Sequence, residues 1–221
     1  MPSKRNTRSG SSGPSLLETF EVFKQERYPG LAPSTQKRYD TASIHLPSGR
    51  KSISLYTPLE ITEHLKNLTP GAHHGTRSLL SAMMSMAIGK GWRTDNPVFH
   101  VPAKKLGTIS RWPRNRIYEA IGRLPPEEGR ALSLMYETVQ RLSDIERLRP
   151  ENLDGSVLTI YQKKTGNKVI LPLSQDVAQM LLASGTQPGQ RYVAIPRHRI
   201  YRALKKVNEE LGMKVTPHGL R

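Results

Sequence analysis

Hydrophobic residues in the first part of the chain recur at steps of three and four, the spacing of one face of an α-helix. In residues 15–27 this stripe consists of Leu16, Leu17, Phe20 and Phe23. Further helices are predicted over 33–46, over 57–68 with Thr57 as N-cap and Pro58 behind it, and over 71–92. The residues of 71–92 expected to face inward are Leu79, Leu80, Met83, Met86 and Ala87. Residues 14–97 therefore predict a small all-helical domain.

The pattern of the second half is mixed. Hairpin-like runs rich in β-branched residues occupy 156–162 and 168–173 and are joined by "KKTGN". A short strand is predicted over 191–195, and a last helix is expected to begin at Thr216 and Pro217. Helical patterns cover 114–124, 125–139, 141–149, 174–184 and 196–212. Residues 113–221 thus predict a second domain of helices and a small sheet.

Two segments lack a period. Residues 1–13 are basic and rich in Ser and Gly, and we expect a disordered tail. Residues 98–112 predict a basic linker between the domains, since no acid follows Asp95 in this region. The cations that we expect to contact DNA lie in and after this linker and in the helix over 196–212: Lys104, Lys105, Arg111, Arg114, Arg197, Arg199 and Arg202. A solvated basic surface is the alternative for each group.

Charge adds a partner to this picture. The chain has 34 Lys and Arg against 18 Asp and Glu, a net charge of +16, with a pI near 10.3. Such an excess attracts polyanions, and nucleic acid is the usual one. The absence of cysteine excludes disulfides, thiolate nucleophiles and zinc–cysteine sites. No apolar run approaches the roughly 18 residues that span a bilayer, and no secretory signal is evident, so we expect a cytoplasmic protein without a membrane partner.

Four basic residues lie near predicted turns or helix starts: Arg141, Lys164, His218 and Arg221. A phosphodiester needs such a set, because two guanidiniums can hold its non-bridging oxygens while Lys and His transfer protons. His218 and Arg221 are three apart and would share one helix face. Each residue taken singly also has a plain structural explanation as a surface charge or a local hydrogen-bonding group. Their order and context decide between the two interpretations.

Three stretches carry a resemblance to a known family: "ETVQRLSDIERLRPENLD" (137–154), "YQKKTGNKVILPL" (161–173) and "VTPHGLR" (215–221). Together they resemble the catalytic domain of tyrosine recombinases, the phage integrase family, and most of all the lambda type. The first half resembles the family's helical core-binding domain. The fold that the resemblance implies is α+β and mostly helical, with an N-terminal all-α SAM-like core-binding domain followed by a mixed α/β catalytic domain with a small antiparallel sheet.

The resemblance also implies roles for the basic residues. Arg141 and Arg221 would clamp the scissile phosphate, Lys164 would protonate the leaving 5′ oxygen, and His218 would exchange a proton with the nucleophile. Asp144 would support the first arginine. The family usually has Gly in the turn before that arginine, whereas this chain has Val139 and Gln140, and the change bears on how Arg141 is placed.

Site-specific DNA recombination or integration through a phosphotyrosine is the function implied, with no metal or other cofactor. In the family the tyrosine nucleophile follows the second arginine by several dozen residues, but all eight tyrosines here precede Arg221. We therefore expect a fragment that binds double-stranded DNA but is inactive alone, in a bacterial host cell and at its nucleoid. Self-association on DNA is expected of the full-length form. His73 and His74 are adjacent on a predicted helix, and we expect a surface or DNA-facing role for them rather than a metal site.

Two other functions remain open from the residues. A non-catalytic basic DNA-binding protein would have the same charge and helices and would never have had a nucleophile. A metal-dependent nuclease is the third possible function, but the sequence shows no carboxylate cluster of the kind that a two-metal site requires.

Overall fold

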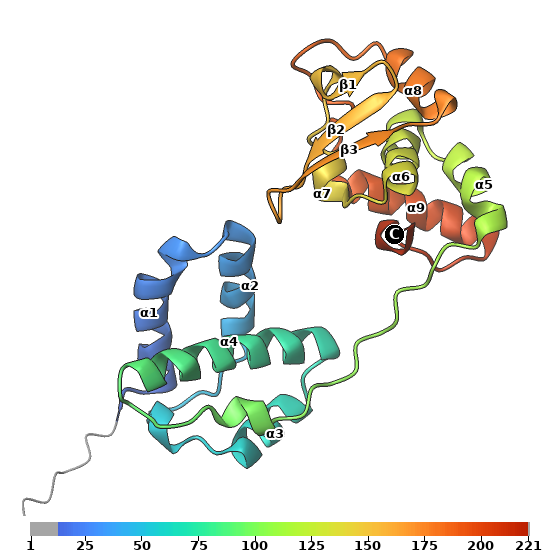
Figure 1. The fold of residues 1–221 in the computed structure, drawn as a ribbon. Helices are drawn as coiled ribbons and strands as arrows, with labels where there is room; N and C mark the ends of the chain where they lie inside the picture. Colours follow the sequence, from blue (N-terminus) through green and yellow to red (C-terminus); the bar gives the residue numbers. More distant parts are fainter. Residues whose placement is uncertain (1–12, 221) are drawn as a thin grey trace, which may run out of the picture. The chain divides into compact units, whose positions relative to one another are not determined.

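The computed structural model describes residues 13–220, which form two compact units with a boundary after Gly107. The first unit is helical, and the second combines helices with one three-stranded antiparallel sheet (Figure 1). The fold class predicted from the sequence is therefore confirmed. The boundary falls inside the predicted linker over 98–112, while the exact domain limits stay predictions. The predicted tail lies outside the described residues except for Gly13.

The first unit contains four α-helices: α1 (Leu16–Arg27), α2 (Pro33–Ser43), α3 (Pro58–Lys66) and α4 (Pro70–Gly89). Short 3-10 turns lie between and after them: η1 (Tyr28–Gly30), η2 (Ile53–Leu55) and η3 (Pro97–His100). Thr57 caps α3 as predicted, and Glu60 completes a capping box by accepting from the Thr57 backbone. Ser15 and Glu18 form the same box at the start of α1. Local sequence signals thus set where these helices begin.

The core of the first unit is built around α4. The five residues of this helix predicted to face inward are all buried. Leu17 was also predicted to face inward, and this is wrong, because its side chain is 52% exposed while Leu16, Phe20 and Phe23 form the buried face of α1. The surface role predicted for His73 is likewise wrong, since its side chain is 4% exposed.

The end of the first unit is fixed by polar side chains. Arg77 of α4 donates to the carbonyls of Val98 and Val101. The buried amide of Asn96 donates to Ser81 and Ser85 of α4 and accepts from Val98 N. The segment that leaves the unit is therefore attached to its central helix along several residues.

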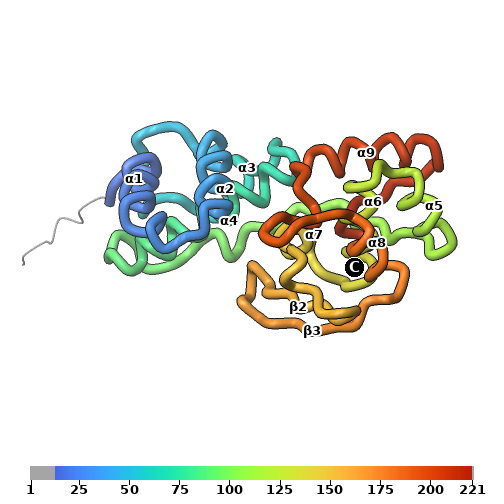
Figure 2. Tube along the Cα trace, turned by 90° about the horizontal axis from the view of Figure 1, so that it is seen from above, coloured from blue at the N-terminus to red at the C-terminus, as the bar shows by residue number. Residues whose placement is uncertain are grey.

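The second unit begins with η4 (Arg114–Arg116) and α5 (Ile117–Gly122), followed by α6 (Pro126–Thr138) and the short α7 (Leu142–Ile145). After η5 (Pro150–Asn152) come β1 (Leu153–Asp154), β2 (Val157–Tyr161) and β3 (Lys168–Pro172). The last elements are α8 (Gln175–Leu182), α9 (Arg197–Leu211) and η6 (Pro217–Leu220). Figure 2 shows the same unit from above, with α9 along one edge and β2 and β3 at the opposite edge.

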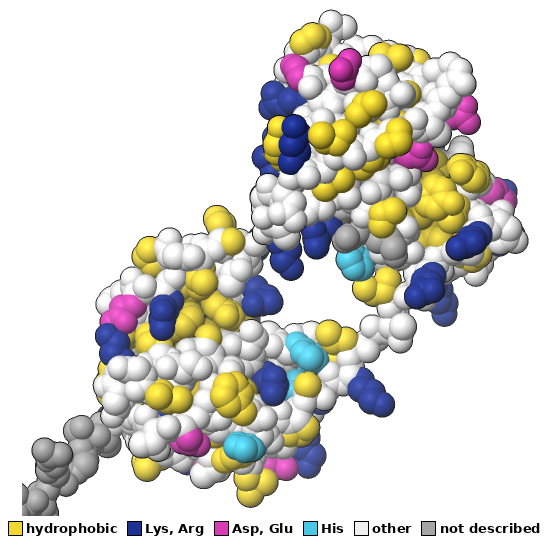
Figure 3. Space-filling view, in the orientation of Figure 1, with side chains coloured by type: hydrophobic (Ala, Val, Ile, Leu, Met, Phe, Trp, Pro, Cys, Tyr) yellow, Lys and Arg dark blue, Asp and Glu magenta, His cyan; other side chains and the backbone are white. Residues whose placement is uncertain are grey.

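The sheet has the order β1-β2-β3, and both pairs are antiparallel. Leu158 and Ile160 of β2 are buried in the core, whereas Val157, Tyr161 and Ile170 lie on the other face and are 41–60% exposed. Hydrophobic side chains are visible over β2 and β3 in Figure 3. This alternation is that of a sheet with only one face on the core.

Two predicted elements of this unit are wrong. The helix over 141–149 extends only from Leu142 to Ile145, and the chain is extended at Arg149 (φ −135°, ψ 165°), the residue that Pro150 restricts. No strand forms over 191–195 in the described part of the chain. Tyr192 instead donates its N–H to Leu148 O, and its carbonyl accepts from the Arg130 guanidinium. Within residues 13–220, no helix has the length and apolar character to cross a membrane.

Candidate functional site

Arg141 stands in the turn between α6 and α7. Helix α6 ends at Thr138, and Val139 follows in the left-handed region (φ 54°, ψ 21°). Arg141 then returns to an extended backbone and caps α7, its carbonyl accepting from Asp144 N (2.8 Å) and Ile145 N (3.1 Å). The Arg141 side chain is half-buried and has no acceptor among the described residues. It is therefore available to an anion.

Lys164 lies at the tip of the hairpin between β2 and β3. Gln162 N donates to Asn167 O at 2.9 Å, and Gly166 N donates to Gln162 O at 2.8 Å, which closes the loop. Gly166 has a φ of 74°, a conformation that costs glycine little. Lys164 is exposed, and its ammonium has no partner in residues 13–220.

Two hydrogen bonds join this hairpin to the Arg141 turn. The Gln162 amide donates to Gln140 Oε1 at 2.7 Å, across 22 positions of sequence. The backbone N–H of Lys163 donates to Asp144 Oδ1 at 2.8 Å. The hairpin lies beside α7 in Figures 1 and 2. The turn that carries Arg141 is thus bonded directly to the hairpin that carries Lys164.

Asp144 is 1% exposed, and its carboxylate holds the hairpin backbone. In the described part of the chain its Oδ2 has no hydrogen-bond partner. Asp144 N also donates to Arg141 O at the start of α7, and the support of Arg141 by the Asp144 carboxylate stays a prediction.

His218 lies in η6, close to the expected helix start, and its side chain is exposed. The turn is fixed through Thr216, whose carbonyl accepts from Trp112 Nε1 (2.8 Å) and Gly219 N (3.0 Å). A Cβ at Gly219 would lie 2.2 Å from Ser110 O, so only glycine fits there. Because η6 also packs against α6, His218 is anchored to the helix that leads to Arg141. The predicted site residue Arg221 lies outside the described residues.

A family model described as "Phage integrase family" matches residues 114–221. Those residues hold all three stretches that carry the resemblance and the turn, hairpin and η6 described above. The second unit belongs to the phage integrase family.

Solved integrases have the same fold. A lambda integrase dimer bound to a COC′ core site is 22% identical, covers 94% of this chain and 84% of its own, and has a TM-score of 0.78. A lambda integrase tetramer bound to a Holliday junction is 21% identical, covers 100% of this chain and 76% of its own, and has a TM-score of 0.76. A Tn1549 transposon integrase in complex with a circular intermediate DNA is 13% identical with coverages of 94% and 84% and a TM-score of 0.75. No curated protein matches the chain in sequence.

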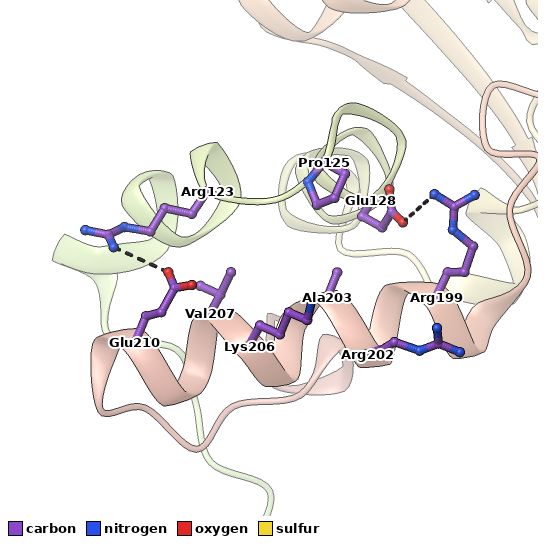
Figure 4. Close-up of a pocket in the computed structure, with 9 residues that line it drawn as sticks. All are labelled: Arg123, Pro125, Glu128, Arg199, Arg202, Ala203, Lys206, Val207 and Glu210. Atoms are coloured by element: carbon purple, nitrogen blue, oxygen red, sulfur yellow. Dashed lines mark ion pairs between the residues drawn. The ribbon is translucent and has the colours of Figure 1, made fainter.

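In this integrase-family unit, the arginines of α9 differ in their surroundings. Arg197 makes a bidentate pair with Glu146 (2.6 and 2.7 Å), and these bonds raise the pKa of Arg197 above its usual value. Arg199 pairs at 3.1 Å with Glu128, which is 3% exposed. Arg202 has no acceptor among the described residues and lines a groove of about 250 Å³ beside α9 (Figure 4). Arg202 is therefore the most available of the three.

The predicted linker cations also divide. Lys104 donates to the carbonyls of Lys66 (2.5 Å) and Leu68 (2.7 Å) and so occupies the end of α3. Lys105, Arg111 and Arg114 are exposed and, in the part of the chain that the structure describes, have no acceptor. Their contact with DNA stays a prediction.

Sequence reasoning missed Gln140 and Gln162 as parts of this region. Gln140 is 9% exposed, and a buried amide at a turn is a signal that a specific partner exists. The sequence does not say that the partner is Gln162, because their pairing depends on how the hairpin folds over α7.

Proposed function

We propose that this chain binds duplex DNA and carries the phosphate-binding part of a tyrosine-type site-specific recombinase. The observation that carries the proposal is the direct bonding between the Arg141 turn and the Lys164 hairpin within a unit that belongs to the integrase family. The similar solved structures supply a second line of support, because they are integrases bound to DNA.

Each basic residue has a distinct task in the proposed site. The Arg141 and Arg221 guanidiniums bind the non-bridging oxygens and stabilise the charge that grows on the phosphorus centre during phosphoryl transfer. The Lys164 ammonium gives its proton to the leaving 5′ oxygen. The His218 imidazole exchanges a proton with the attacking hydroxyl.

The nucleophile, in this proposal, is not among residues 1–221. The family places its tyrosine after the second arginine, and the eight tyrosines of this chain all precede it. Tyr192 is 3% exposed, and its burial raises the pKa of its hydroxyl, which makes it a poor nucleophile. Tyr161 is 54% exposed and directly precedes Gln162, so it is the residue to examine if a covalent complex forms.

A gel-shift titration across salt concentration tests the DNA-binding part. Contacts with six to ten phosphates would lower the affinity for a duplex by about 10³–10⁵ between 50 and 200 mM salt. An affinity that does not change with salt would contradict binding through the phosphate backbone.

A nicked suicide duplex tests the absence of the nucleophile. The expected result is no covalent complex on a denaturing gel, although the same duplex is bound in the native gel. A covalent complex that disappears in Tyr161→Phe would overturn this part and identify the nucleophile. The same assay separates a recombinase fragment from a binding protein, since adding the tyrosine-bearing segment of a related integrase restores the complex only in the first case.

We also propose self-association on DNA. Two of the similar solved structures are a lambda integrase dimer and a lambda integrase tetramer bound to DNA, and a longer form of this chain would associate in the same way. The net charge of +16 opposes association without DNA, because like charges on two copies repel. The site of action would be DNA in a bacterial cytoplasm.

A further inference from the structure

We propose that Gln140 and Gln162 are positioning residues that hold Lys164 in register with Arg141. The inference rests on the proposed function, because it assigns Lys164 to the phosphate of that site. Four residues form a continuous series of side-chain hydrogen bonds, here called the glutamine network: Thr165, Gln162, Gln140 and Thr138.

The direction of the bonds in the glutamine network is determined. Thr165 Oγ1 donates to Gln162 Oε1 at 2.7 Å, so the Gln162 amide nitrogen faces Gln140. Gln162 Nε2 then donates to Gln140 Oε1, and Gln140 Nε2 donates to the Thr138 carbonyl at 3.1 Å. Each amide thus uses its oxygen toward the hairpin and its nitrogen toward α6. A flipped amide at either position would set two donors or two acceptors against each other.

Two members of the glutamine network are the sequence neighbours of the cations. Thr165 follows Lys164 directly, and Gln140 precedes Arg141 directly. Gln140 is buried, so its bonds are shielded from competition with water. The tip of a hairpin is otherwise free to move, because its side chains are exposed and few contacts restrain it. The network supplies the restraint that Lys164 itself lacks.

The turn at Val139 gives the network a second task. A β-branched residue in the left-handed region is strained, and such a conformation persists only where its surroundings determine it. Gln140 N donates to Thr138 Oγ1 at 3.2 Å while the Gln140 side chain donates to the Thr138 carbonyl, so both groups of Gln140 close this turn. The residue that holds the hairpin therefore also holds the turn of Arg141.

Gln162→Glu is the variant that tests the network with least change of shape. A carboxylate has the size of the amide but cannot donate to Gln140 Oε1. Gln179→Glu is the matched control, because Gln179 is exposed on α8 and makes no side-chain hydrogen bond within the described residues. Both variants change the net charge equally.

A pair of spin labels measures the position of the Lys164 hairpin relative to α7 in the absence of DNA. The chain has no cysteine, so Lys164→Cys with Arg147→Cys carries two unique nitroxides. One narrow distance distribution is expected in the parent and in Gln179→Glu, and a broadened distribution in Gln162→Glu below its melting temperature. An unchanged distribution in Gln162→Glu overturns the inference, whatever the function of the site.

Amine modification of Lys164, read by mass spectrometry, measures its position on DNA. Duplex DNA is expected to protect Lys164 in the native sequence and in Gln179→Glu. Protection should fall about threefold to tenfold in Gln162→Glu, the change that one lost hydrogen bond produces, while overall duplex affinity stays nearly constant. Lack of protection in the native sequence would contradict the assignment of Lys164 in the proposed function. Full protection in Gln162→Glu would contradict the positioning role alone.

Discussion

Val139 is, within residues 13–220, the one residue other than glycine with a positive φ. Its side chain is 52% exposed, so burial gives little compensation for the strained backbone. The sequence offered a hint at this position, because the resembling family usually has glycine in this turn. A turn that glycine would adopt without strain is here formed by valine, one position before the buried Gln140.

Val139→Gly should raise the free energy of unfolding by roughly 0.5–1 kcal/mol. Relief of the left-handed conformation is worth about 1–2 kcal/mol, and the greater freedom of glycine in the unfolded chain offsets about 0.5–1 kcal/mol of it. Urea titration followed by circular dichroism measures the change. Val157→Gly, at an exposed position of β2, is the control and should destabilise; equal destabilisation by both variants would contradict the strain.

His73 is a buried imidazole whose Nδ1 has no partner in the described part of the chain. Burial lowers its pKa below the usual value, and the nearby cations Lys104, His74 and Arg77 act in the same direction. The His74 ring lies edge-on to it, with centroids 5.9 Å apart. The folded state therefore binds a proton at His73 less readily than the unfolded state does.

The first unit should consequently lose stability as pH falls below about 6.5, the usual pKa of histidine, because the unfolded chain takes up a proton that the folded unit resists. His73→Gln should flatten this dependence between pH 7 and 5. Amide hydrogen exchange in α4 is the measurement, with the exposed His100→Gln as control. If the exchange free energy of α4 had the same pH dependence in the native protein and in His73→Gln, His73 would not be the source of the pH-dependent loss of stability.

At the scale of elements, local signals predicted helices well and tertiary pairing poorly. Thr57, Pro58 and Glu60 mark the start of α3 by their own side chains, and the structure has the same start. The strand expected over 191–195 did not form, because the backbone of Tyr192 is bonded to Arg130 of α6 and to Leu148 in a loop, and no strand of residues 13–220 pairs with it. Apolar runs of this length do not say which partner will bury them.

The 3-10 turn η6 depends on close contact with the chain before α5. Gly219→Ala should cost roughly 1–3 kcal/mol, because the added methyl would overlap Ser110 O and force the backbone apart. Thermal unfolding measures the loss. Gly122→Ala is the control, since a Cβ there meets nothing within 4 Å. A Gly219→Ala protein as stable as Gly122→Ala would contradict the packing of η6.

Helix α9 should contact DNA mainly through Arg202. Arg202→Ala is expected to lower the slope of log affinity against log salt by about 0.9, the value of one phosphate contact. Arg199→Ala should instead reduce stability by roughly 1–3 kcal/mol, because it leaves Glu128 buried without its cation. Gel shifts and urea titrations of both variants separate the effects. The reverse pattern would show that the ion pair opens to bind DNA.

At the scale of the whole molecule, composition and motif order predicted more than single residues did. The net charge of +16 and the three ordered stretches predicted a DNA-binding integrase fold, and the family match and the fold agree. The bonds that join the Arg141 turn to the Lys164 hairpin were beyond the sequence, because they form only after β2 and β3 pair and pack over α7. Such contacts between distant segments have no local pattern.

The central claim is that Arg141, Lys164, His218 and Arg221 bind one phosphate of a duplex. A methylphosphonate scan tests it most directly: on a duplex selected for tight binding, single phosphates are neutralised in turn, and the affinities of the native chain and of the four alanine variants are compared. We expect one phosphate position at which neutralisation lowers the affinity of the native chain for the duplex but has little further effect on the affinity of any of the four alanine variants. Coupling of the four residues to different phosphates, or to none, would contradict the claim.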